Sequence, residues 1–129
     1  EIAKKHKFVK LHPDVPEMQP FLQSAQVFLH PHAGGSGIQN KLLEALSCGC
    51  PVVTTPTGNQ GIDGTHGENI MIGESIDDLA EHTLEVLKNK ELAEKISQNG
   101  RDWILRTHSW DSVYSAMDNI INDVMNSGK

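Results

Sequence analysis

The sequence has few cysteines, few aromatic residues and no long apolar run. Its 129 residues include two cysteines, and aromatic side chains make up 5% of the chain. Cys48 and Cys50 are separated by one glycine, a spacing that supports neither a disulfide framework nor a common metal site. No apolar run approaches the roughly 20 residues that a membrane-spanning helix needs. We therefore expect reduced cysteines in the core of a soluble, cytoplasmic protein.

A concentrated basic surface is also lacking. The net charge is -6, and the 11 Lys and Arg residues are scattered along the chain. This distribution argues against a nucleic-acid-binding face, because phosphate backbones require clustered positive charge. A small anion could still bind through backbone amides. Residues 1–7 carry neither a start methionine nor the apolar region of a signal peptide, so we expect an excised piece of a longer protein.

The pattern of apolar residues predicts strands that alternate with helices. We expect strands at residues 8–11, 27–29, 52–55 and 69–72, and a loop at 56–67. We expect helices at 17–24 and from residues 38, 75, 90 and 109. Gly49 is placed to end the second of these helices. The length suits one domain, and the alternation predicts an α/β fold with a Rossmann-like parallel sheet and flanking helices.

Two helices carry more detailed expectations. Ser75 followed by Asp78 resembles a capping box, which marks a helix start. The buried side of that helix is expected to consist of Ile76, Leu79, Ala80, Leu84 and Leu87. In the last two helices, Trp103 and Trp110 are interpreted as core residues and not as stacking platforms.

The stretch from His30 to Asn40 occupies the place where parallel sheets bind ligands, beyond a strand end and before a helix. Its glycines at 34, 35 and 37 let the backbone turn tightly and approach a ligand, and the free amides of the next helix favour phosphate. Lys41 could add a charge contact to that phosphate. Glu44, further along the helix, could accept hydrogen bonds from a ribose diol. The residues thus predict a phosphate-type ligand site.

Other sites are excluded or disfavoured by spacing. The three glycines do not follow the dinucleotide-binding pattern, and the Gly-Lys-Ser/Thr ending of a P-loop is missing. His30 and His32 flank Pro31 and suggest zinc, but two histidines without a third ligand nearby are a weak signal. No metal is expected, and His32 is interpreted as facing the ligand.

The stretch at residues 35–55, GSGIQNKLLEALSCGCPVVTT, resembles the donor-site region of group 1 glycosyltransferases. The similarity extends to residues 9–16, to the loop at 56–62, to Gly67-Glu68-Asn69, and to the closing helices with Ser109-Trp110. It therefore covers nearly the whole chain. The order and spacing of these segments are more specific than any one glycine pair.

The resemblance implies a GT-B fold and a retaining, hexosyltransferase-type transfer of a sugar from a nucleotide diphosphate, as in polysaccharide biosynthesis. Residues 1–129 would be a partial C-terminal nucleotide-sugar-binding domain that lacks the upstream strands and the N-terminal acceptor domain. The implied partners are a nucleotide sugar, an acceptor saccharide or lipid-linked saccharide, and the protein's own N-terminal domain. No cofactor is implied. The location would be cytoplasmic, or peripheral at the inner face of the membrane, and this piece alone is expected to be inactive.

Glu44 matches the second glutamate of the family's paired-glutamate signature, which typically binds the ribose. The first glutamate is replaced by Ser36, so the resemblance assigns no catalytic residue. The expected donor-binding residues are His32, Ser36, Gly37, Ile38, Gln39, Asn40, Lys41 and Glu44. Two alternatives remain open, namely a sugar-nucleotide epimerase of the same architecture and a non-catalytic nucleotide-sugar-binding module.

Overall fold

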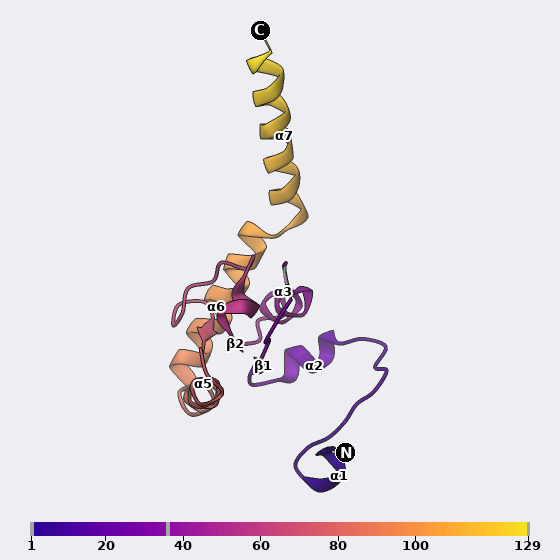
Figure 1. The fold of residues 1–129 in the computed structure, drawn as a ribbon, viewed down its shortest axis with the longest axis vertical. Helices are drawn as coiled ribbons and strands as arrows, with labels where there is room; N and C mark the ends of the chain where they lie inside the picture. The colour runs from indigo at the N-terminus through magenta and orange to yellow at the C-terminus, as the bar shows by residue number, and fades with distance from the viewer. Residues whose placement is uncertain (1, 36, 129) are drawn as a thin grey trace.

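The computed structural model describes residues 2–35 and 37–128. Figure 1 shows one compact body, with the N-terminal segment and the last helix extending from its opposite ends. The elements in chain order are α1 (Ile2–Lys5), α2 (Gln19–Ser24), β1 (Phe28–His30), α3 (Asn40–Ser47), β2 (Val52–Thr54), α4 (Pro56–Asn59), β3 (Met71–Ile72), α5 (Ile76–Lys88), α6 (Lys90–Thr107) and α7 (Trp110–Ser127).

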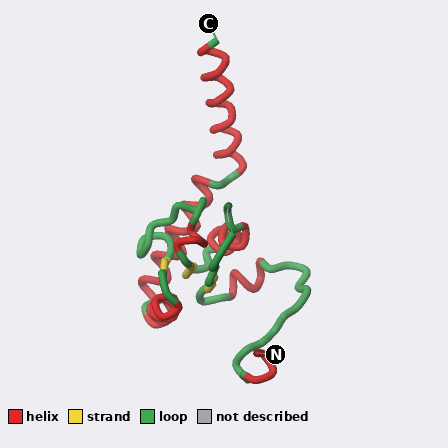
Figure 2. Tube along the Cα trace, in the orientation of Figure 1, coloured by secondary structure: helices red, strands yellow, loops and turns green. Residues whose placement is uncertain are grey.

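The three strands form a parallel sheet in the order β1-β2-β3. They lie inside the body and are short compared with the helices around them (Figure 2). In the central strand, Val52 and Val53 point to opposite faces, and both are 0% exposed. The sheet is therefore covered on both sides, and the expected α/β fold with a parallel sheet and flanking helices is confirmed.

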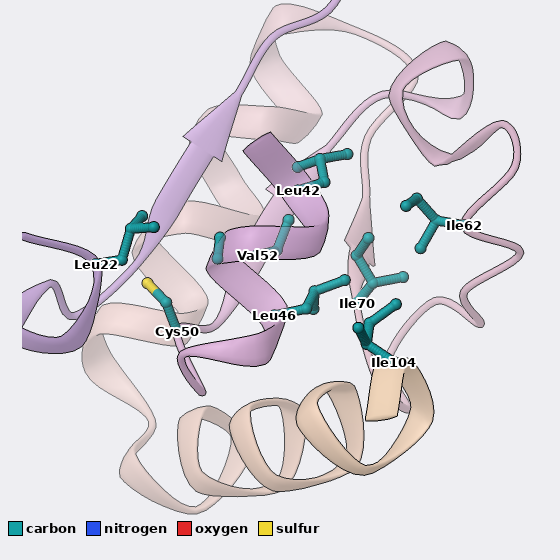
Figure 3. Packing of buried hydrophobic residues seen from close by; sticks show 9 residues of the cluster. Leu22, Leu42, Leu46, Cys50, Val52, Ile62, Ile70 and Ile104 are labelled. Carbon is teal, nitrogen blue, oxygen red and sulfur yellow. The ribbon is translucent and has the colours of Figure 1, made fainter. Parts of the chain in front are cut away.

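The larger part of the core lies on the face of the sheet that α3 covers (Figure 3). Its buried residues are Leu22, Leu42, Ala45, Leu46, Cys50, Val52, Ile62, Ile70 and Ile104. Both cysteines are free, with Cys50 buried and Cys48 packed against this cluster. The expectation of unpaired cysteines in the core is confirmed. Gly49 follows the C-cap of α3 with a φ of 71°. This is the left-handed backbone conformation with which many α-helices end.

The opposite face carries a second buried cluster. It consists of Val53, Met71, Leu79, Val86 and Ile96. Helices α5 and α6 supply three of these residues and close this side of the sheet. Strand β2 therefore lies between the two clusters.

Two expected elements differ from the structure. Residues 8–11 form no strand, and the side chains of Phe8 and Leu11 are 88% and 74% exposed. A strand needs a neighbour to pair with, and no described strand lies beside this segment. The expected loop at 56–67 begins with the short helix α4, because the Thr55 side chain accepts a hydrogen bond from the Gly58 amide and caps it.

The start of α5 is confirmed, but its buried side is not the expected one. Ser75 and Asp78 form a capping box with both reciprocal hydrogen bonds. Of the five residues expected inside, Leu79 is buried, whereas Ile76 is 83% exposed. Ala80, Leu84 and Leu87 are exposed as well. The side that meets the sheet runs through Leu79 and Val86, which are seven positions apart. The helix carries two apolar stripes, and the expectation placed the wrong one inside.

The two tryptophans have different environments. Trp103 is partly buried and packs against the core, as expected. Trp110 is 74% exposed, so its assignment to the core is wrong. The cause is the direction of α7, which leaves the body and carries its apolar side chains with it (Figure 1). None of the described helices combines the length and apolar character needed to cross a bilayer.

Candidate functional site

The candidate site lies where the carboxyl ends of β1 and β2 lead into loops and into the N-terminus of α3. Gly35 and Gly37 have φ values of 108° and 94°. Residues with a β-carbon rarely adopt such backbone conformations. Gln39 is the N-cap residue, and its side chain makes no capping hydrogen bond. Its amide instead donates to the Gly37 carbonyl at 3.3 Å. The first turn of α3 therefore presents backbone amides that no side chain among the described residues caps.

Two hollows are lined by residues that precede or follow this turn in the chain. The first has a volume of about 570 Å³ and lies at the ends of β1 and β2. Its lining residues are Pro31, His32, Ala33, Thr55, Pro56, Thr57, Glu74, Ser75, Ile76 and Leu79. The second has a volume of about 480 Å³ and lies between α2 and α3. Its lining residues are Glu17, Met18, Gln19, Leu22, Glu44, Ser47 and Cys48.

The expected site residues divide between these two hollows. His32 lines the first and Glu44 lines the second. A smaller hollow of about 140 Å³ brings Lys41 and Glu44 together with Phe28. Gly37, Ile38, Gln39 and Asn40 form the stretch between them and are exposed or partly exposed. Ser36 lies outside the described residues.

A hydrogen-bond network joins the ends of β1 and β2. His30 is paired with Thr54 in the sheet register, so the two side chains lie on the same face. The Thr54 hydroxyl donates to the His30 carbonyl at 2.9 Å and lies 3.4 Å from His30 Nδ1. Since the hydroxyl proton is already used, Nδ1 of the neutral ring must be the donor in the second contact. This assignment leaves a lone pair on His30 Nε2.

The residue that follows β2, Thr55, holds His32, which lies two positions after the end of β1. The Thr55 hydroxyl donates to the His32 carbonyl at 2.6 Å and accepts from the Gly58 amide at 3.0 Å. The Thr55 side chain thus caps α4 and also binds the backbone of His32. This double contact fixes the loop that leaves β1 against the loop that leaves β2.

The imidazole rings of His30 and His32 are stacked, with centroids 5.1 Å apart and planes inclined by 18°. Burial lowers the pKa of His30, and the neighbouring His32 and Lys41 lower it further. Nitrogen lone pairs lie in the ring planes, so two nearly parallel rings cannot direct them at one metal ion. Within residues 2–35 and 37–128, no group of three or more His, Cys, Asp or Glu residues could hold a metal.

His32 also has a polar atom without a partner. Its Nε2 is buried and makes no hydrogen bond to any residue that the structure describes. Gly35 lies directly beside it, since a β-carbon at position 35 would be 3.4 Å from Nε2. A buried imidazole nitrogen without a partner is costly and calls for an explanation.

Several residues that shape the site were not singled out by the sequence. Thr54 and Thr55 could have been, because hydroxyl side chains at the carboxyl end of a buried strand commonly bind loops or ligands. Gly58 and Gly61 stand in a loop rich in turn residues, where nothing distinguishes them. His108 contacts this loop from the end of α6, 47 positions away from Gly61, and no local pattern announces such a contact.

Comparison with known proteins gives two relatives and a family. A curated protein from Klebsiella pneumoniae, described as an uncharacterized 44.6 kDa protein in the cps region, is 27% identical over 105 residues, which are 81% of this chain and 27% of that protein. The crystal structure of the C-terminal domain of a glycosyl transferase group 1 family protein from Francisella tularensis matches with a TM-score of 0.68 at 20% identity, covering 79% of this chain and 53% of that one.

At 20% identity the second match supports the fold of the C-terminal domain, and the first shows that this chain spans about a quarter of its curated relative. The family itself comes from a direct match. The model of the family described as Glycosyl transferases group 1 matches residues 1–89 of the 129. This chain belongs to the group 1 glycosyltransferase family.

Proposed function

We propose that this chain forms part of the donor site of a retaining glycosyltransferase of the hexosyltransferase type. The observation that carries the proposal is the N-terminus of α3, which follows a glycine loop and lacks a side-chain cap; residues before and after it in the chain line two hollows. Backbone amides at such a terminus bind phosphate oxygens, and the helix dipole adds to the attraction. The diphosphate of the donor binds at Gly37 to Asn40.

The nucleoside then extends along α3 into the hollow between α2 and α3. Glu44 stands one turn after Asn40 and lines this hollow. A carboxylate accepts two hydrogen bonds, which suits the two hydroxyls of a ribose. Met18 and Leu22 supply apolar surface beyond Glu44, against which the base packs. Lys41, from the same helix, contributes a positive charge to the phosphate next to the ribose.

The donor sugar occupies the hollow that His32 lines. The unpartnered Nε2 of His32 binds one of its hydroxyl groups, and the Ser36 hydroxyl is proposed as a further contact from its residue type alone. During transfer, the acceptor hydroxyl oxygen bonds to the anomeric carbon as the bond between that carbon and the diphosphate oxygen breaks, and the hydroxyl proton passes to the departing diphosphate. Negative charge grows on the diphosphate as it leaves. The amides of Gly37 to Asn40 stabilise that charge, since donors fixed before the reaction act most strongly where charge develops. No metal ion or other cofactor is required in this scheme.

The acceptor is a saccharide or a lipid-linked saccharide, bound by an N-terminal domain of the longer protein. The relative encoded in a cps region supports a role in polysaccharide biosynthesis. The protein works in the cytoplasm or at the inner face of the membrane, where such acceptors are extended. Because residues 1–129 contain half of the cleft, we propose that this chain alone does not turn over substrate.

Titration calorimetry of the chain with UDP, GDP and ADP tests the donor site. We expect one of the three diphosphates to bind, and the corresponding nucleoside without phosphate to bind at least tenfold more weakly, because the α3 amides are lost to it. Absence of binding for all three would overturn the donor-site proposal.

Radiolabelled UDP- and GDP-sugars with a saccharide acceptor test the chain's inactivity, and measurable transfer by the chain alone would contradict it. The same assay on the longer protein separates the reaction types. Sugar transfer with release of nucleotide supports a glycosyltransferase. An isomerised donor indicates an epimerase, and binding without either product indicates a binding module.

A further inference from the structure

The end of α6 holds the loop that follows α4. Trp103 donates from its indole Nε1 to the Ile62 carbonyl at 3.0 Å. His108, the C-cap residue of α6, has its Nε2 2.9 Å from the Gly61 carbonyl. Two consecutive carbonyls of the loop are thus bound by two side chains of one helix end. The loop is therefore held by side chains from a distant part of the chain.

The direction of the His108 contact follows from its partner. A carbonyl oxygen accepts only, so Nε2 carries a proton and donates to Gly61. On the other side of the ring, Nδ1 lies 2.7 Å from the Thr107 hydroxyl, which also lies 2.7 Å from the Trp103 carbonyl. Whichever of these two groups receives the Thr107 proton, the donor at Nε2 remains. The hydrogen bond to Gly61 therefore persists in either arrangement.

Gly61 in turn lies against the candidate phosphate loop. Its φ is 76°, and a β-carbon there would be 2.7 Å from Ile38 Cγ1 and 3.6 Å from Ile38 Cα. A side chain at 61 would therefore collide with the Ile38 side chain, which lies against the Gly61 backbone. Ile38 directly precedes Gln39, the N-cap residue of α3. We therefore expect a displacement of Gly61 to disturb Ile38 and, through it, the start of that helix.

We propose that His108 is a positioning residue for the donor site. It does not touch the ligand; it holds the Gly61 carbonyl, Gly61 holds Ile38, and Ile38 sets the amides at the N-terminus of α3. The proposal rests on the proposed function in one respect, namely that these amides bind the diphosphate. The mechanical connection from His108 to Ile38 does not depend on any ligand.

Two variants separate the hydrogen bond from the bulk of the side chain. His108→Phe keeps an aromatic ring and removes the donor. His108→Gln keeps an N–H group at a similar distance from the backbone and is expected to rescue the wild-type behaviour. His6→Phe, at an exposed position in the N-terminal segment, is the matched control for adding a phenyl ring to the protein.

The first measurement is amide hydrogen exchange in the ligand-free chain. In His108→Phe, the amides of Leu42 and Leu43, which donate to the Gln39 carbonyl in the first turn of α3, should exchange about three- to tenfold faster, the factor that corresponds to one hydrogen bond of ordinary strength. In His108→Gln and His6→Phe they should stay near wild-type rates. Unchanged rates at Leu42 and Leu43 in His108→Phe would overturn the proposal. An acceleration spread evenly over β2 and α5 would also overturn it, since that pattern indicates a loss of global stability.

The second measurement is the affinity for UDP, GDP and ADP. The Kd of whichever diphosphate binds should rise by a similar factor in His108→Phe and remain close to wild type in His108→Gln. Binding that is equally tight in His108→Phe would contradict the positioning role. If the wild-type chain binds none of the three, the proposed donor site fails, while the exchange rates still decide whether His108 positions the loop.

Discussion

Gly58 lies so close to the Thr54 hydroxyl that a β-carbon at position 58 would overlap its oxygen. The same β-carbon would be 3.4 Å from His30 Nδ1. Thr54 is 0% exposed and cannot swing aside without losing its bond to the His30 carbonyl. The close approach of α4 to the ends of β1 and β2 therefore depends on the absence of a side chain at 58.

Gly58→Ala should accordingly destabilise the fold. We expect its free energy of unfolding to fall by about 1–3 kcal/mol, the usual cost of overpacking a filled site. Urea denaturation followed by circular dichroism measures this difference. Gly34→Ala is the control, because a β-carbon at 34 would meet nothing within 4 Å. Equal stability of the two variants would contradict the assigned contact.

Glu44→Ala should weaken nucleotide binding with little effect on folding, since this side chain is exposed. Loss of hydrogen bonds to a charged group costs about 1.5–3 kcal/mol, which corresponds to roughly a ten- to hundredfold rise in Kd. Calorimetry with the diphosphate that the wild type binds measures the change. Glu81→Ala, exposed on α5, should bind as the wild type does. An unchanged Kd for Glu44→Ala would remove Glu44 from the ribose contact.

Local signals and tertiary signals differed in how well the sequence revealed them. The cap formed by Ser75 and Asp78 was predicted correctly because its hydrogen bonds involve neighbours in the chain. The buried side of α5 was not, because both Leu79 and Ile76 belong to apolar stripes, and contact with the sheet chooses between them. Phe8 illustrates the same limit in a strand, since strand propensity without a partner strand produces no strand.

In the candidate site, the glycine loop and Glu44 were proposed from residue type, spacing and family resemblance. The residues that hold these segments in place were not predicted. His108 and Gly61 meet across 47 positions, and their contact depends on where α6 ends relative to β2. Such a relationship follows from packing of whole elements, so a single sequence carries no periodic or local mark of it.

Leu42→Ala should cost far more stability than Ile120→Ala. Leu42 is 0% exposed in the cluster under α3, whereas Ile120 on α7 is 63% exposed. Truncation of a buried leucine typically costs about 2–5 kcal/mol, and exposed substitutions stay within roughly 0.5 kcal/mol. Thermal and urea unfolding of both variants provide the comparison. Similar losses would mean that α7 contributes to the cooperative core in solution.

Cys50 should make stability fall at alkaline pH. Burial, with a smaller effect of Cys48, raises the pKa of its thiol from 9.0 to about 11. Between these values the folded chain keeps a proton that the unfolded chain releases, so the unfolding free energy decreases as pH rises. Well below pH 9 the Cys50 thiol is protonated in both the folded and the unfolded chain, so the unfolding free energy loses nothing to its ionisation.

Urea unfolding at pH 8, 9 and 10 tests this dependence. The stability advantage of the wild type over Cys50→Ala should shrink by about 1 kcal/mol between pH 9 and 10, because one unit of pH corresponds to about 1.4 kcal/mol per proton. Cys48→Ala should show the wild-type slope. A constant difference across this range would show that the Cys50 thiolate forms in the folded chain without penalty.

The long last helix turns a small change at its base into a large one at its tip. The 18 residues of α7 reach about 27 Å at the ordinary rise of a helix. A rotation of about 10° where α7 begins would move its far end by about 5 Å on that length. His108 directly precedes the N-cap residue of α7 and also contacts the Gly61 carbonyl. A rotation of α7 about its base would therefore act on the residue that holds the loop after α4.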